Sequence, residues 1–180
     1  LSQGAWNATI GKAGSTIDVK GNASFRMFNN NSTSAVPAIT NTINFQKGKT
    51  LTIDGGQRCK LLGKLTGEGT LKISFPYVRG DFETNCSAFE GTLNPTSGQF
   101  RISNTLDLSK GTFQPEAGVY VANAKSQSGT EESRTNKIGA LQGTAADASF
   151  GTGVWNVGYL GTSTTFAGKF NSSATLNKYG

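Results

Sequence analysis

The chain has 180 residues, which is enough for one domain with a sizeable core. Only 35% of the residues are hydrophobic and 24 are glycines, but the aliphatic residues fall in short alternating groups, which argues against a disordered chain. The net charge of +6 comes from scattered Lys and Arg residues without a dense basic run, so no nucleic-acid partner is expected. The chain contains no His, which excludes Ser-His-Asp and Cys-His catalytic nucleophiles.

The first part of the chain predicts short β-strands joined by turns. Alternating apolar residues bounded by Gly or Asn are typical of strands, and they occur at residues 8–10, 16–19, 23–28, 43–45, 51–53 and 61–62. Glycines in segments 47–49 and 54–56 predict turns between these strands, and the polar run 29–34 predicts a loop. We expect no helix in this part of the chain.

A repeated motif begins at residue 63. The segment 63–73 combines a Leu-x-Gly step with Gly-Thr-Leu and a short alternating strand. The apolar residue of the step recurs at Leu65, Phe89, Phe113, Leu141 and Phe166. The first three positions are evenly spaced, with a period of about 24 residues. Leu141 and Phe166 have almost the same spacing as Leu65 and Phe89, and a longer interval separates Leu141 from Phe113. Self-similarity at a fixed period predicts stacked coils.

The later segments continue this pattern with one exception. Short alternating triplets at 71–73, 100–102, 119–121 and 155–157 predict equivalent strands of one sheet. Residues 131–141 have helical propensity but poor apolar spacing, so we expect a loop that lengthens one coil from about 24 to about 28 residues. The large apolar residues expected in the core are Phe89, Phe100, Phe113, Trp155 and Phe166.

These features predict an all-β parallel β-helix, a solenoid of about 24-residue coils, formed by residues 1–180 as a single module. An antiparallel β-sandwich also has short strands with turns every 8–12 residues, and it is the competing fold. The motif occurs as two pairs of steps with nearly the same spacing, and this repetition favours the solenoid.

The two cysteines, Cys59 and Cys86, are separated by close to one expected coil period. Stacking of neighbouring coils makes them a candidate disulfide pair. The alternative is two free, partly buried thiols, because the Cα separation that decides the matter is not given by a sequence.

Neither a membrane span nor a signal peptide is expected. No apolar run approaches the roughly 20 residues that a span requires, and no charged start precedes an apolar core. The chain begins with Leu rather than Met, so we expect a piece excised from a longer precursor or enzyme.

Four segments carry a resemblance to a known family: 65–71, 78–82, 87–93 and 158–168. They resemble the autotransporter-associated β-strand repeats of bacterial surface and secreted proteins, over residues 63–180. The overall pattern is also similar to a carbohydrate-binding module family with a right-handed parallel β-helix that accompanies a xylanase. The resemblance implies a right-handed coil, a secreted or cell-surface location, and a polysaccharide-degrading domain in the same chain.

Two catalytic schemes survive the absence of His. A carboxylate pair, Asp81 with Glu83 or Glu68 with Glu90, would serve glycoside hydrolysis if it lay across a cleft. The β-helix polysaccharide lyases, by resemblance, use a basic residue with calcium held by carboxylates, which draws attention to Arg79. The structural alternative, in which Arg79 and Asp81 pair with each other or with the backbone, is favoured. We therefore expect no catalysis and no cofactor, with a structural calcium ion left open.

Carbohydrate binding needs an exposed aromatic ring beside polar groups, because sugar rings stack their C–H faces on aromatic side chains. Core packing is the competing role for each such ring. The candidate ligand-binding residues are Trp6, Tyr77, Arg79, Asp81, Glu83, Tyr120 and Tyr159.

The leading hypothesis is a non-catalytic carbohydrate-binding module of a secreted bacterial enzyme. Its partners would be a plant cell-wall polysaccharide, xylan or another β-glycan, and an attached glycoside hydrolase in the same chain. The first alternative is a structural or adhesive β-helix passenger segment of a bacterial surface protein. The second alternative is a small β-helix polysaccharide lyase.

Overall fold

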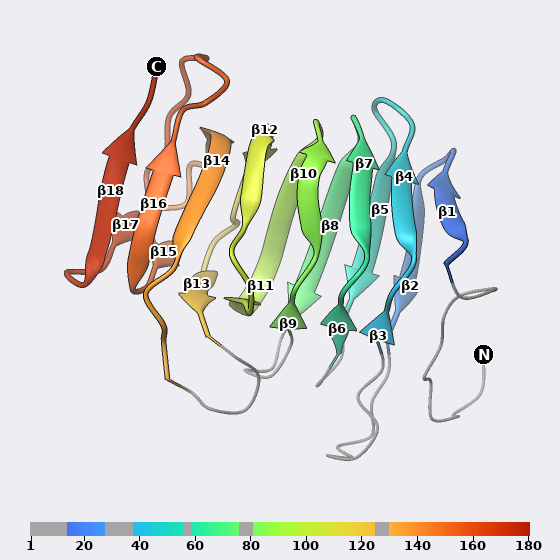
Figure 1. The fold of residues 1–180 in the computed structure, drawn as a ribbon, viewed down its shortest axis with the longest axis horizontal. Helices are drawn as coiled ribbons and strands as arrows, with labels where there is room; N and C mark the ends of the chain where they lie inside the picture. The colour runs from blue at the N-terminus through green and yellow to red at the C-terminus, as the bar shows by residue number, and fades with distance from the viewer. Residues whose placement is uncertain (1–13, 28–37, 56–58, 76–80, 125–129) are drawn as a thin grey trace.

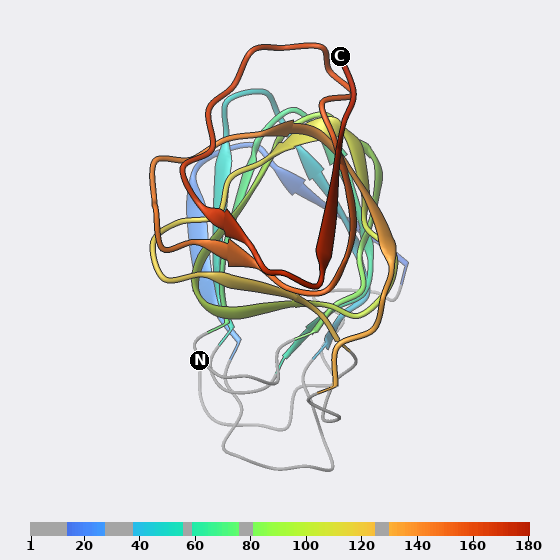
Figure 2. The same ribbon diagram turned by 90° about the vertical axis from the view of Figure 1, so that its left-hand side faces the viewer.

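A computed structural model describes residues 14–27, 38–55, 59–75, 81–124 and 130–180. Over these residues the chain contains strands and turns only, and it winds into a parallel β-solenoid of about six turns that lie about 22 residues apart (Figure 1). Figure 2 looks along the axis and shows the strands surrounding one central core. The predicted parallel β-helix is confirmed, and the parallel pairing excludes the antiparallel sandwich.

The strands form three faces of the solenoid. The first face contains β1 (Thr16–Val19), β4 (Thr42–Phe45), β7 (Lys64–Gly67) and β10 (Asn85–Phe89), and it continues with the starts of β12 (Asp107–Phe113) and β14 (Thr135–Leu141) and with β16 (Gly153–Val157) and β18 (Ala174–Lys178) (Figure 1). The second contains β2 (Ala23–Arg26), β5 (Thr50–Asp54), β8 (Thr70–Phe75), the start of β11 (Thr92–Ile102) and the ends of β12 and β14. The third contains β3 (Ala38–Ile39), β6 (Lys60–Leu61), β9 (Asp81–Phe82), the end of β11, β13 (Tyr120–Asn123), β15 (Ser149–Phe150) and β17 (Lys169–Phe170).

Residues in equivalent positions of successive coils form rows along the axis. Leu51, Leu71, Leu93 and Phe113 pair in register and are all buried, with exposed fractions between 0 and 3%. The preceding threonines form a parallel outward row that is half-buried. Alternation along each strand therefore separates core from surface in every coil.

The register corrects the predicted coil length from about 24 residues to about 22. Phe89 pairs with Gly67 and not with Leu65, so the proposed echo of Leu65 at Phe89 was out of register. The Gly-Thr-Leu echo was correct, because Thr70, Thr92 and their neighbours pair directly. The longer coil is also confirmed, since Phe113 pairs with Leu141 across a wider interval than separates Leu93 from Phe113. The predicted loop at 131–141 was wrong, because most of it forms β14.

Aromatic side chains fill the C-terminal half of the core. Phe82, Phe100, Phe113 and Phe150 follow one another with ring centroids 5.0 to 6.0 Å apart. The predicted core residues Phe89, Phe100, Phe113 and Trp155 are fully buried, and Phe166 packs against the core while partly exposed. The Trp155 indole nitrogen donates to the Gly151 carbonyl, which satisfies the one polar group of this large side chain.

Candidate functional site

The predicted site residues do not gather in one place. Trp6, Tyr77 and Arg79 lie outside the described residues. Asp81 and Glu83 lie on the third face in the middle of the solenoid, whereas Tyr120 lies farther along the same face. Tyr159 lies on the turn that follows β16. Each position therefore has to be examined by itself.

Asp81 belongs to a buried ion pair. Its side chain is fully buried, and Lys60, its register partner on β6, places the ammonium 3.6 Å from Oδ2 and 4.0 Å from the Glu83 Oε1 atom. The Ser103 hydroxyl donates to Asp81 Oδ1 at 3.0 Å. A buried carboxylate needs such partners. The arrangement fixes neighbouring coils to one another, and it buries Asp81 while the Lys60 and Glu83 side chains stay partly exposed.

Tyr120 is engaged by a carboxylate from a different part of the chain. Its hydroxyl donates to Glu131 Oε1, and the Thr152 amide donates to Glu131 Oε2 at 2.6 Å. Gly151 lies beside this contact, where a Cβ would come within 2.5 Å of Glu131 Oε2. Burial, and then the Glu131 carboxylate, raise the pKa of Tyr120 to about 12, so the phenol stays protonated. The hydroxyl thus holds Glu131 in place.

Tyr159 forms an exposed aromatic pair with a residue that the sequence did not indicate. Its ring stacks on Tyr179, with centroids 4.9 Å apart and planes inclined by 14°. The two rings remain 40% and 45% exposed, and Leu160 beside them is 42% exposed. Gly158, at φ +107°, lets the Tyr179 backbone approach, because a Cβ there would overlap the Tyr179 carbonyl. The pair is the largest exposed aromatic surface of the described residues.

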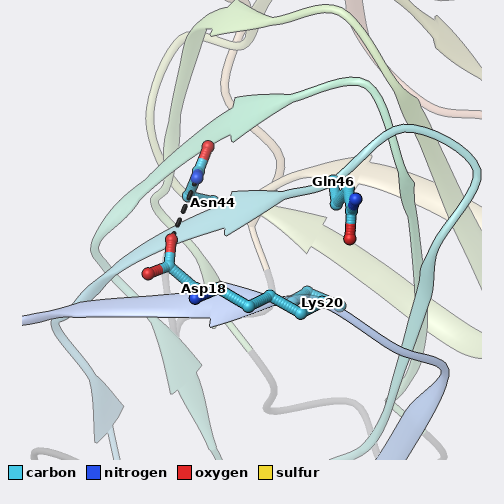
Figure 3. A pocket seen from close by; sticks show the side chains of 5 residues that line it. Asp18, Lys20, Asn44 and Gln46 are labelled. Carbon is cyan, nitrogen blue, oxygen red and sulfur yellow. Dashed lines mark hydrogen bonds between the residues drawn. The ribbon is translucent and has the colours of Figure 1, made fainter.

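A polar hollow lies on the first face near the start of the solenoid. It has a volume of about 290 Å³ and is lined by Asp18, Val19, Lys20, Asn44 and Gln46. Figure 3 shows Asn44 pointing at Asp18, to which its amide donates at 3.0 Å. Thr66 donates to Asn44 in turn, which extends the ladder to a third coil. Among the described residues, no aromatic side chain lines the hollow, so they provide no flat apolar surface of the kind that a sugar ring uses.

Alternation in the sequence contained a signal for this hollow. Ile17 and Val19 face the core, so Asp18 and Lys20 must face outward, as must Asn44 between two buried neighbours. Tyr179 had no comparable signal, because its exposure depends on its place in the last coil.

The open question of a structural calcium ion gains no supporting site. The described residues contain no group of three or more acidic or Cys side chains suited to a metal.

Cys59 and Cys86 are both free and buried, so the candidate disulfide is not formed. The coil register explains this result. The amide of Asp81 donates to the Cys59 carbonyl and Lys60 pairs with Asp81, so Cys59 lies on the third face beside β9. Cys86 lies well beyond Asp81, on the first face instead of the third. Burial raises the pKa of both thiols, which keeps them in the unreactive protonated form.

We expect a thiol reagent to modify neither cysteine in the native protein and both in the denatured protein. The thiolate is the reactive species, and both side chains are buried and protonated. Absorbance of the released chromophore with Ellman's reagent, with and without denaturant, measures this directly. A denatured sample that releases none would show that the two thiols are bridged after all.

Comparisons with known proteins identify no relative of this chain. No family model matches it, and neither a curated protein nor a solved structure matches. In the described part of the chain no helix is long and apolar enough to cross a membrane.

Proposed function

We propose that this chain is a non-catalytic carbohydrate-binding module that holds a plant cell-wall polysaccharide, with xylan favoured, for an attached glycoside hydrolase. The observation that supports this function is the exposed pair of Tyr159 and Tyr179 at the C-terminal end of the solenoid. The location that goes with it is extracellular or at the cell surface, as the resemblance to secreted bacterial repeats implies.

The tyrosine pair has the chemistry that a glycan chain requires. A sugar ring presents a flat C–H face that packs on an aromatic ring, and its hydroxyls bond to nearby polar groups. Stacking fixes the orientation of both tyrosines before a ligand arrives, which lowers the entropy lost on binding. The same turn continues into residues 162–165, which are exposed and carry hydroxyl side chains. Weak binding at such a surface raises the local concentration of an attached enzyme.

Alanine at Tyr159 or Tyr179 should weaken binding to xylan about 10-fold, because each change removes one stacking ring. Isothermal titration against xylan, glucomannan, pectin and cellulose measures the affinity of the 180-residue protein and the two variants. Tyr120→Phe is the matched control: it removes only a hydroxyl that bonds Glu131, and it should leave affinity unchanged. Unaltered affinity in both alanine variants would move the site elsewhere, and failure of every polysaccharide to bind would refute the function.

A structural or adhesive passenger segment is the second candidate function. It is favoured by the parallel stacking of one coil on the next, which extends through the described residues to β18. This function predicts that none of the four polysaccharides binds, so the same titrations separate it from the first. The lyase alternative predicts ultraviolet absorbance from unsaturated products in the same polysaccharide samples with calcium.

A further inference from the structure

The polar hollow between β1 and β4 contains side chains that take no part in the proposed function. It has a volume of about 290 Å³. In Figure 3 Asp18 and Asn44 lie at one side of the hollow, Gln46 lies at the other, and Lys20 extends between them. All four residues are exposed, so their polar groups are open to a ligand from solvent.

Asp18 is held in one orientation by hydrogen bonds that cross three coils. Asn44, its register partner, donates its amide to Asp18 Oδ1 at 3.0 Å, and Thr66 donates its hydroxyl to Asn44 Oδ1 at 2.9 Å. These bonds use one oxygen of the carboxylate and fix the position of the other. Among the described residues no group bonds to Asp18 Oδ2, so this atom is an oriented acceptor for a ligand.

Lys20 and Gln46 provide the other polar groups of the hollow. The backbone amide of Gln46 donates to the Val19 carbonyl, which places Gln46 beside Lys20 in the neighbouring coil. Within the described part of the chain, neither side chain has a hydrogen-bond or ion-pair partner. The Lys20 ammonium is a donor only, whereas the Gln46 amide both donates and accepts. The hollow therefore offers an acceptor, a donor and a mixed group to the same ligand.

This combination suits the hydroxyl edge of a sugar. A hydroxyl group donates and accepts at one atom, so it can donate to Asp18 Oδ2 while it accepts from Lys20, and the adjacent hydroxyl of the same ring can bond to Gln46. The opposite charges of Asp18 and Lys20 balance one another, which favours a neutral ligand over an ion. No aromatic side chain among the described residues lines the hollow, so the ligand is held by its polar edge and not by its C–H face.

We propose that the hollow binds one neutral sugar residue, at the end or on a branch of a glycan chain, through two adjacent hydroxyl groups. Small-molecule sites begin at about 300 Å³, so a hollow of about 290 Å³ accommodates one ring and not a chain. The inference rests on the proposed function in taking a carbohydrate as the ligand. It adds a second contact far from the tyrosine pair, because β1 and β4 lie at the opposite end of the solenoid from β16 and β18 (Figure 1).

Nuclear magnetic resonance titration of the 180-residue protein with methyl β-xyloside and methyl β-glucoside tests the hollow. We expect saturable amide shifts at Lys20 and Gln46, with a dissociation constant on the order of millimolar for at least one glycoside. Asp18→Asn and Lys20→Met should each raise this constant at least about 10-fold, because each removes a charge-assisted hydrogen bond. Lys64→Met is the matched control, since Lys64 is an exposed lysine on β7 of the same face outside the hollow, and its constant should be unchanged.

Three results would overturn the proposal: no shift at Lys20 and Gln46 with either glycoside, equal constants for Lys20→Met and Lys64→Met, or saturable binding of sodium acetate in the hollow in place of the glycosides. These results are separate from the test of the proposed function. Shifts confined to Tyr159 and Tyr179 would support the tyrosine site and refute the hollow. Shifts at Lys20 and Gln46 in a protein that binds none of the four polysaccharides would support the hollow and refute the proposed function.

Discussion

Alanine at Gly91 is expected to destabilise the protein by about 3 kcal/mol, which corresponds to a fall in Tm of about 10 °C for a chain of this size. A Cβ at this corner would overlap the carbonyl oxygen of Gly69 and come within 2.6 Å of the Phe89 ring. That carbonyl accepts the Thr92 amide at 2.9 Å, so it cannot move aside without breaking the ladder between two coils. Thermal unfolding followed by circular dichroism measures the change.

Gly21→Ala is the matched control for Gly91→Ala. Gly21 lies at a turn between β1 and β2, and a Cβ built on it meets no atom within 4 Å. Its Tm should change by no more than about 2 °C, as for an ordinary surface substitution. Equal Tm values for the two variants would mean that the corner tolerates a side chain and that the close approach is not rigid.

Phe150→Ala should cost about 3 to 5 kcal/mol, the largest loss expected from a single truncation in this core. The ring is fully buried and contacts four other aromatic rings, with centroids 4.7 to 5.8 Å away: Phe113, Trp155, Phe166 and Phe170. Its removal leaves a cavity that a closed stack of strands cannot collapse to fill. Chemical denaturation gives the free energy of unfolding.

Phe25→Ala provides the comparison for Phe150→Ala. Phe25 on β2 is only partly buried, so its truncation should cost about 1 to 2 kcal/mol. Phe150→Leu, which preserves most of the apolar volume, should fall between these two values. If Phe150→Ala proved no more destabilising than Phe25→Ala, the aromatic contacts around Phe150 would add nothing to stability.

The fold was predictable because the Gly-Thr-Leu corner is a local signal with a simple physical cause. Gly69, Gly91 and Gly111 stack where successive coils leave no room for a Cβ, so the residue type is fixed by geometry. The coil length was less predictable, because the interval between paired positions varies from coil to coil and turns absorb the difference. A period taken from the apolar residues alone therefore placed Phe89 out of register.

The candidate site was predictable only in part. Tyr159 follows a glycine at a turn, and that local pattern led to its selection from the sequence. Its partner Tyr179 belongs to the next coil and becomes a neighbour only through the pairing of β16 with β18. Asp81 illustrates the opposite case: an acidic residue beside a glycine suggests a surface site, whereas Lys60 and Ser103 from adjacent coils bury it. Contacts between coils therefore determine both the pairing of Tyr159 with Tyr179 and the burial of Asp81.

The register of the rows has a consequence for the length of the molecule. Each coil contacts mainly the coil before and after it, and it advances the structure by one strand spacing, about 4.8 Å. Gain or loss of a whole coil between matched corners such as Gly69 and Gly91 would join equivalent backbones and leave every remaining junction as it is. The length of the solenoid can thus change during evolution in steps of one strand spacing, while the packing within the remaining coils is unchanged.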